Sequence, residues 1–251
     1  MIGAREFEPK GWDLARSQGL IAVNFRQAFG DDALEAMSYI EEIVENVRDD
    51  SSYARRGGLD RLTEMLAELK SNPIVVAIRS IGFEALCGLV MRTQGYEQIE
   101  LGRVVPWQQT GGRDADVFGI RGDELRIIEC KACHRRKSIS PSEVRKFFTE
   151  TVPAVKAWLR LNNRPFGRCR AEIWTTGTKG KEAGYALHGL ASPKSDDWAI
   201  LRIDEIKPLL PESIRRRSLE LLNSIAAAEI DGYYDEVVAN VDDSEFRTNQ
   251  A

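Results

Sequence analysis

Four charged residues near the middle of the chain have side chains suited to hydrolytic chemistry. Asp114 and Asp116 lie in the stretch GRDADVFGI, and Glu129 and Lys131 lie in the stretch LRIIECKA that follows it. Carboxylate oxygens are the ligands that a hard divalent cation such as Mg²⁺ prefers. A lysine beside such an ion can orient a water or stabilise charge on a phosphate oxygen. The next question is whether the fold brings these four side chains together.

The two stretches have the pattern of a β-hairpin. Gly122–Asp123 fits a two-residue turn of type II′, in which glycine occupies the first central position. That turn places Asp116 opposite Glu129, and Asp114 near Lys131 one step further along. Opposed residues share one face of a sheet, with Cβ atoms ~5 Å apart, and so do residues two apart in one strand. We therefore expect the four side chains on one face of the sheet.

This arrangement is unfavourable without a counter-charge. Opposed carboxylates repel each other, and the apolar residues of both strands indicate that the hairpin lies inside the sheet. A cation held by Asp116 and Glu129 would remove the repulsion. The alternative is an ion-pair cluster with Lys131 at the open end of the sheet. A turn longer or shorter by one residue would put the opposed acids on different faces.

The same stretch also contains the pattern C-x-x-C-H, formed by Cys130, Cys133 and His134, which is typical of covalent haem attachment. On a strand, Cys130 points away from the acids and is expected to be a small buried side chain. Covalent haem attachment also needs an export route, and the N-terminal residues show no apolar signal. Zinc could use these residues with Cys169 or His188, but a second pair at zinc-finger spacing is missing. The carboxylate site is therefore favoured over both.

The composition is that of a globular protein of 251 residues, with 43% hydrophobic residues and a net charge of −4. The segment 126–181 has 14 Lys and Arg against 4 Asp and Glu, whereas residues 229–251 have 7 acids and one arginine. A basic segment in an acidic chain is typical of proteins that bind polyanions, and a solvated face is the alternative. No apolar run reaches the ~18 residues that span a membrane. Four cysteines do not indicate a disulfide scaffold, so we expect a cytoplasmic protein without a membrane partner.

Hydrophobic periodicity predicts an α/β fold with a mixed central sheet. Residues 1–72 are expected to be a helical segment, 73–210 the core, and 211–251 a C-terminal helix with an acidic tail. In the core and after it, helices are expected at Pro73–Gln94, Ser140–Leu161, Lys181–Ala191 and Glu212–Ala228. Strands are expected at Glu97–Val105, Asp114–Ile120, Leu125–Ala132, Ala171–Thr176 and Trp198–Ile203.

The stretches RDADVFGI and LRIIECKA resemble the D…(D/E)-x-K signature of the PD-(D/E)xK nuclease superfamily, which has the restriction-endonuclease-like fold. IGFEALCGLVMRTQGYEQIEL resembles the first core helix of its Mrr-type branch. AEIWTTGTKGKEAGYALHG and WAILRIDEI resemble the last strands of that branch and the helix between them. The resemblance covers residues 78–210. The proline of the signature is absent before the first acid, and so is the glutamine that some relatives carry on the helix after the lysine.

The resemblance implies roles for four residues. Asp116 and Glu129 match the metal-binding acids, with the carbonyl of Cys130 as a further ligand, and Lys131 matches the catalytic lysine. Glu84 matches the glutamate of the first helix, which helps to position the metal in relatives. Glu84 also lies in an almost wholly apolar helix, where a carboxylate is costly unless it is paired or metal-bound. An acid favoured by the helix dipole after a glycine is the alternative.

Asp114 competes with Asp116 for the ligand role. We favour Asp116 because an aliphatic residue follows it and because Glu129 opposes it. Other basic residues near the lysine are expected to bind nucleic acid, first on a loop and then on the next helix: His134, Arg135, Arg136, Lys137, Arg145 and Lys146.

The resemblance implies an endonuclease that uses Mg²⁺ or Mn²⁺ to hydrolyse phosphodiester bonds, with double-stranded DNA as the expected substrate and restriction or antiviral defence as the expected role. Four alternatives stay open: a binding module with the nuclease fold, an effector that acts with a partner protein, an RNA-directed nuclease, and a DNA-repair nuclease. Residues 1–72 are the expected surface for a protein partner. The sequence does not decide the oligomeric state, and a homodimer stays open.

Overall fold

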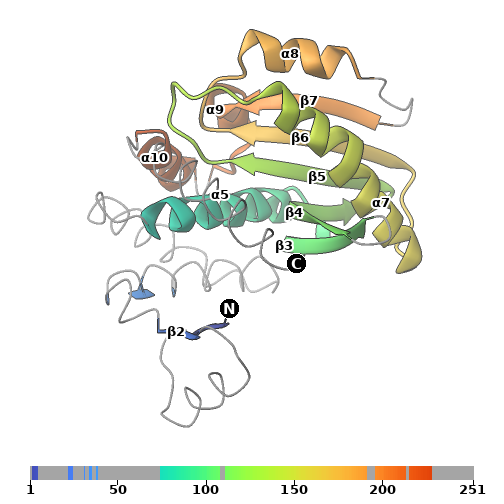
Figure 1. The fold of residues 1–251 in the computed structure, drawn as a ribbon, viewed down its shortest axis with the longest axis horizontal. Coiled ribbons are helices and arrows are strands. Elements are labelled where there is room, and N and C mark those ends of the chain that lie inside the picture. Colours follow the sequence, from blue (N-terminus) through green and yellow to red (C-terminus); the bar gives the residue numbers. More distant parts are fainter. Residues whose placement is uncertain are drawn as a thin grey trace, which may run out of the picture.

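The computed structural model of the protein describes residues 74–107, 111–190, 196–212 and 215–227, together with ten positions among residues 2–38 (Figure 1). Within the expected helical segment 1–72, two short strands, β1 (Ile2–Ala4) and β2 (Ala22–Asn24), pair in parallel. Helical positions are described at residues 31, 34, 35 and 38. The rest of the expected N-terminal helices and the acidic tail lie outside the described residues.

Five strands form a single mixed sheet in the order β3-β4-β5-β6-β7. β3 (Glu97–Trp107), β4 (Gly111–Arg121) and β5 (Glu124–Lys131) are antiparallel neighbours. β6 (Arg168–Thr175) and β7 (Asp196–Arg202) run parallel to β5. The expected α/β fold with a mixed central sheet is therefore confirmed, and each expected strand is present with its ends shifted by at most three residues.

Helices cover both faces of this sheet (Figure 1). One face carries α5 (Ile74–Thr93), α9 (Ile203–Ile206), a 3₁₀ turn η3 (Lys207–Leu209) and α10 (Arg215–Ala226). The other carries α6 (Pro141–Lys146), a π-helical turn η2 (Phe147–Thr151), α7 (Val152–Leu161) and α8 (Lys181–His188). No described helix is both long and apolar enough to cross a membrane.

Two separate apolar clusters hold the layers together. α5 packs on the sheet through Phe83, Leu86 and Val90, which are at most 1% exposed. On the opposite face, Phe147 and Phe148 of η2 are buried against β4, β5 and β6. Because both faces are covered, the middle of β5 is a continuous buried run from residue 125 to residue 128. Burial on both faces fixes the position of the hairpin that carries the acids.

The hairpin has the predicted register. β4 and β5 pair from Arg121↔Glu124 to Val117↔Ile128. Gly122 has φ +60°, whereas Asp123 is not among the described residues with positive φ. This combination is that of a type II′ turn, in which only the first central residue needs a conformation that glycine adopts without strain.

Candidate active site

A hydrogen bond from the backbone of β5 to the side chain of Asp116 continues the link between β4 and β5 beyond their last paired residues. Paired residues are described only as far as Val117↔Ile128, and one step beyond them the amide of Cys130 donates to Asp116 Oδ2 at 2.6 Å. The Asp116 carboxylate therefore turns toward β5, beside Glu129. The predicted proximity of these two acids is confirmed, although a side chain rather than a backbone pair makes the link.

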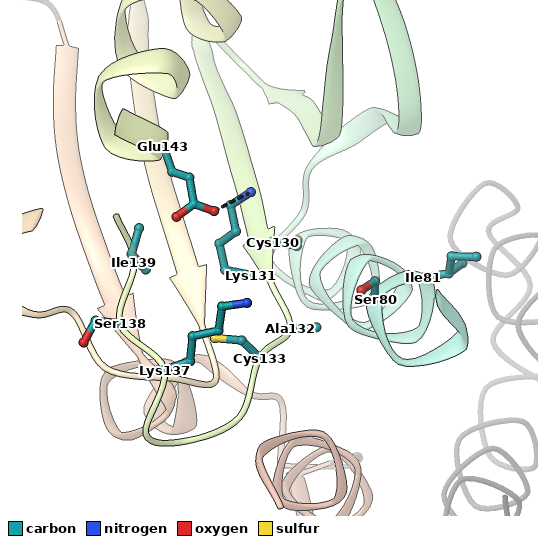
Figure 2. A pocket seen from close by; sticks show the side chains of 10 residues that line it. All are labelled: Ser80, Ile81, Cys130, Lys131, Ala132, Cys133, Lys137, Ser138, Ile139 and Glu143. Atoms are coloured by element: carbon teal, nitrogen blue, oxygen red, sulfur yellow. Dashed lines mark ion pairs between the residues drawn. The ribbon is translucent and has the colours of Figure 1, made fainter. Parts of the chain in front are cut away.

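Lys131 forms ion pairs with two acids from different elements, and Figure 2 shows the pair with Glu143. Its Nζ is 2.9 Å from Glu129 Oε1 and 3.7 Å from Glu143 Oε1. Glu143 is held at the start of α6 by a capping box, because its Oε2 accepts from the backbone N–H of Ser140 at 2.8 Å while the Ser140 hydroxyl caps the helix. The helix that follows the basic loop therefore supplies a second fixed carboxylate to the lysine.

Glu84 approaches the acids of the hairpin from helix α5. Its Oε2 lies 3.9 Å from the point where a Cβ on Gly102 of β3 would stand. The strand neighbours of Gly102 pair with Ala115 and Val117, so this position lies beside Asp116 across the β3–β4 ladder. The structure thus brings Glu84 toward the acids of the hairpin, as the resemblance implied.

Burial and neighbouring charges dominate the electrostatics of the acids. Burial, followed by repulsion from Glu129 and Glu84, raises the pKa of Asp116 to about 8. Burial, followed by repulsion from Asp114 and Glu129, raises the pKa of Glu84 to about 7. Lys131 lowers both values but does not offset the burial of the acids. Asp116 and Glu84 therefore keep their protons up to neutral pH, whereas ordinary surface carboxylates lose theirs well below it.

Lys131 is held as a cation. Burial opposes its charged form, but the attraction of Glu129, a hydrogen bond to Glu129 and the charges of Glu143 and Asp116 together raise the pKa of Lys131 above its usual range. The side chain is therefore an ammonium group at neutral pH. It can donate hydrogen bonds and stabilise negative charge, but it cannot accept a proton as a general base.

The donor set suits a hard divalent cation. Asp116 and Glu129 supply carboxylate oxygens and Glu84 supplies a third. Burial and neighbouring acids disfavour the charged forms of Asp116 and Glu84, and a bound cation would favour them. Among the described residues, no three His, Cys, Asp or Glu side chains are close enough together to form a preformed metal cage. The acids therefore fit the ion by chemistry, and Asp114 is exposed at the edge of the group.

Among the described residues, the cysteines are not gathered with other ligands into the zinc cluster that their spacing raised as an alternative. Cys130 packs against the apolar cluster of α5, as expected for a strand residue that points away from the acids. Its thiol pKa is raised, first by burial and then by Cys87. Cys133 lies near the Thr175 hydroxyl, with its Sγ 3.6 Å away. The Cys130 thiol is therefore a poor metal ligand, because its thiolate form is disfavoured.

The predicted nucleic-acid-binding residues divide into two groups. His134, Arg135, Arg136 and Lys137 form the loop after β5, and Lys137 lines a cavity next to Lys131 (Figure 2). Arg145 and Lys146 are exposed on α6. Arg145 lines a different hollow, between α6 and α8, so the structure does not bring it to the cavity beside the lysine.

The basic segment 126–181 is less uniform than its charge indicated. At least seven of its 14 basic side chains form ion pairs with acids: Arg126, Lys131, Lys156, Arg164, Arg168, Arg170 and Lys179. The net charge therefore does not describe one continuous basic face. The cations next to the acids, on the loop after β5, remain the best placed to meet a phosphate backbone.

A buried polar network at the other end of the sheet was not predicted. Arg126 and Glu172 are 2% and 0% exposed, and Arg126 donates from Nε and Nη2 to Glu172 Oε2 at 3.0 and 2.6 Å. Arg170 and the Trp174 indole also donate to Glu172, at 2.6 and 2.9 Å. The signal in the sequence was an arginine between leucine and isoleucine in a strand buried on both faces. An arginine in such a position indicates a paired charge inside the sheet.

Comparison with known proteins identifies a domain within the chain. Residues 75–157 match a family model of the Mrr type, and the description of that family is "Restriction endonuclease". Among solved structures, the chain is similar to AF1548, a protein of unknown function, at 17% identity and a TM-score of 0.36 over 51% of this chain and 62% of that one. It is also similar to VC1899 from Vibrio cholerae, at 17% identity and a TM-score of 0.33 over 78% of this chain and 54% of that one. The chain thus spans less than two thirds of either protein, and no curated protein matches it.

Proposed function

We propose that this chain, which in residues 75–157 belongs to the Mrr-type family of PD-(D/E)xK restriction endonucleases, is a divalent-metal-dependent endonuclease that cleaves DNA. The observation that carries the proposal is the group formed by Asp116, Glu129 and Lys131 at the end of the hairpin. Burial and nearby acids raise the pKa of Asp116 there, and the ammonium group of Lys131 is fixed 2.9 Å from Glu129. A phosphodiester needs both features, a cation site and a positive group for its oxygens.

The acids and the lysine would have different roles in the reaction. Asp116 and Glu129, with the carbonyl of Cys130, would hold the ion, and Glu84 would hold or position it from the side of α5. When bound, Mg²⁺ or Mn²⁺ would act as a Lewis acid and lower the pKa of an attached water. Lys131 would donate to a nonbridging phosphate oxygen or to the attacking water, and Glu143 would keep its ammonium in place.

The finer parts of the proposal follow from the family and from the basic loop. Nucleic acid is the substrate that a nuclease family implies, and we propose double-stranded DNA because restriction endonucleases act on it. Arg135, Arg136 and Lys137 would bind phosphates without regard to sequence. A defence role in the cytoplasm and a protein partner at residues 1–72 belong to the same proposal, and a homodimer stays open.

Incubation with supercoiled plasmid tests the proposal. The purified protein should nick or linearise the plasmid in Mg²⁺ or Mn²⁺, and an excess of EDTA should stop the reaction. A parallel incubation with single-stranded DNA and an RNA transcript separates the substrate classes. Cleavage of RNA alone would contradict the DNA assignment, and undiminished cleavage in EDTA would contradict the role of the acids.

A further inference from the structure

A cavity of about 490 Å³ opens directly beside Lys131 (Figure 2). It lies between the first half of α5, the loop after β5 and the start of α6. The lining side chains that matter for its chemistry are Ser80, Lys131, Ala132, Lys137, Ile139 and Glu143. The volume falls within the range of small-molecule pockets, about 300–1,000 Å³. The cavity is therefore too small for a double helix and large enough for one nucleotide unit.

The lining combines positive charge with apolar surface. Lys131 and Lys137 approach from the same side, and Ser80 faces them from α5 (Figure 2). The one acid in the described lining, Glu143, already accepts from Ser140 and lies 3.7 Å from the ammonium of Lys131. Ile139, which is buried, and Ala132 add an aliphatic wall. A ligand that satisfies this lining carries negative charge at one end and a flat or apolar body at the other.

The loop that forms the cavity is fastened before any ligand arrives. The Thr178 amide donates to the Lys137 carbonyl at 2.9 Å, and the Ile139 amide donates to the Thr178 carbonyl at 3.2 Å. Gly177 lies under this loop with no room for a side chain, because a Cβ there would be 2.4 Å from the Lys137 carbonyl oxygen. A preformed cavity loses little conformational entropy when it binds a ligand.

We propose that this cavity binds one unpaired nucleotide of the DNA, next to the phosphodiester that is cleaved. The proposal rests on the nuclease function proposed above, because it takes the ligand of the cavity to be part of the substrate strand. Lys137 contacts the phosphate that flanks the scissile one, while Lys131 remains at the scissile phosphate. The base lies against Ile139 and Ala132, and the Ser80 hydroxyl is available to its polar edge.

This placement has a consequence for substrate choice. A base inside a duplex must leave the stack before it enters the cavity, and that step costs free energy. A base that is already bulged, mismatched or single-stranded avoids most of the cost. The preferred duplex therefore carries an unpaired nucleotide at the cleavage position, and a perfectly paired duplex of the same sequence binds more weakly.

Fluorescence anisotropy in EDTA tests the proposal by binding alone. Two labelled 20-base-pair duplexes are compared, identical except for one extra unpaired thymidine in the middle of one strand. The 251-residue chain should bind the bulged duplex about tenfold more tightly, which corresponds to about 1.4 kcal/mol. Ser80→Trp places a large ring in the cavity and should remove most of this preference. Thr93→Trp puts the same ring at an exposed position on the other end of α5 and should keep it.

The outcomes separate this proposal from the nuclease function. Equal affinity for the two duplexes, or a preference that Ser80→Trp retains in a folded protein, would overturn the nucleotide cavity even if plasmid is cleaved in Mg²⁺. A preference that Ser80→Trp removes would support the cavity even if no cleavage is seen. Thermal unfolding followed by circular dichroism shows whether both tryptophan variants are folded. If Ser80→Trp is unfolded, Ser80→Leu replaces it with the same expected result.

Discussion

Replacing Asp116 by asparagine should stabilise the metal-free protein, and the gain should grow with pH. The pKa of Asp116 is raised from its ordinary value of 3.8 to about 8, first by burial and then by Glu129 and Glu84. The folded protein therefore keeps a proton that the unfolded chain releases, so the free energy of unfolding falls as the pH rises from about 4 to about 8. Asparagine carries no charge in either state, and its oxygen can still accept from the Cys130 amide.

The size of the stabilisation follows from the pKa shift of Asp116. One pKa unit corresponds to about 1.36 kcal/mol, so the charged Asp116 costs on the order of 5 kcal/mol above pH 8 and roughly 1–2 kcal/mol at pH 5. In a chain of this length, 1 kcal/mol moves the melting temperature by roughly 2–4 °C. Asp116→Asn should therefore melt about 10 °C or more above the unsubstituted protein at pH 9 in EDTA. At pH 5 the difference should be less than about half of that.

Melting curves in EDTA at pH 5, 7 and 9 measure this difference. Asp123→Asn is the matched control, because Asp123 lies at the turn of the same hairpin with a side chain that is 66% exposed. That variant should stay within about 0.5 kcal/mol of the unsubstituted protein at every pH. A saturating divalent cation should raise the melting temperature of the unsubstituted protein at pH 9 more than that of Asp116→Asn. A gain from Asp116→Asn that is equal at pH 5 and pH 9, or absent at both, would refute the reasoning.

Two further pairs of substitutions, each with its control, test the buried network and the packing of the loop after β5. Glu172→Ala leaves the Arg126 guanidinium buried without its acid and should cost about 3–5 kcal/mol in urea unfolding, whereas Glu205→Ala at an exposed ion pair should cost less than about 1 kcal/mol. Equal costs would contradict the buried network. Gly177→Ala should destabilise by about 1–3 kcal/mol because its Cβ meets backbone, whereas Gly184→Ala has open space on a helix and should be neutral or stabilising. A neutral Gly177→Ala would show that the loop is not packed as described.

The hairpin was predictable from the sequence because local chemistry determines it. A glycine at the first central position of the turn fixes the type II′ conformation, and the period of two then decides which side chains share a face. The position of Asp116 beside Glu129 follows from these two facts. The first core helix was also predictable, since its apolar run begins after Pro73 and ends ahead of Gly95.

Contacts between distant elements were not predictable in the same way. The approach of Glu84 to Gly102 depends on how α5 packs across β3, and the contact of Glu143 with Lys131 depends on where α6 begins on the sheet. No local rule gives these distances, because each is set by the packing of a whole layer. The cavity beside the lysine is a product of the same packing, which is why neither its Ser80 wall nor its volume appeared in the sequence.

The segment from Phe147 to Thr151 shows a similar limit. Periodicity predicted one helix over residues 140–161, and the structure has one helical stretch from residue 141 to residue 161 with a π-helical turn inside it. A π turn adds one residue without changing which residues are apolar, so the apolar pattern alone does not reveal it. Its effect is to bury both Phe147 and Phe148 against the sheet.

The rate of plasmid cleavage by Lys131→Ala, measured beside the unsubstituted protein in the same Mg²⁺ buffer, tests the central claim most directly. Lys131 is the ammonium group that Glu129 and Glu143 hold next to the proposed metal site, and its loss removes the positive charge without removing a proposed metal ligand. Loss of one such charge-stabilising group costs about 10²–10³ in rate. The proposal therefore predicts at least a 100-fold slower reaction by a variant that still melts cooperatively. Cleavage at an unchanged rate would contradict the assignment of this site.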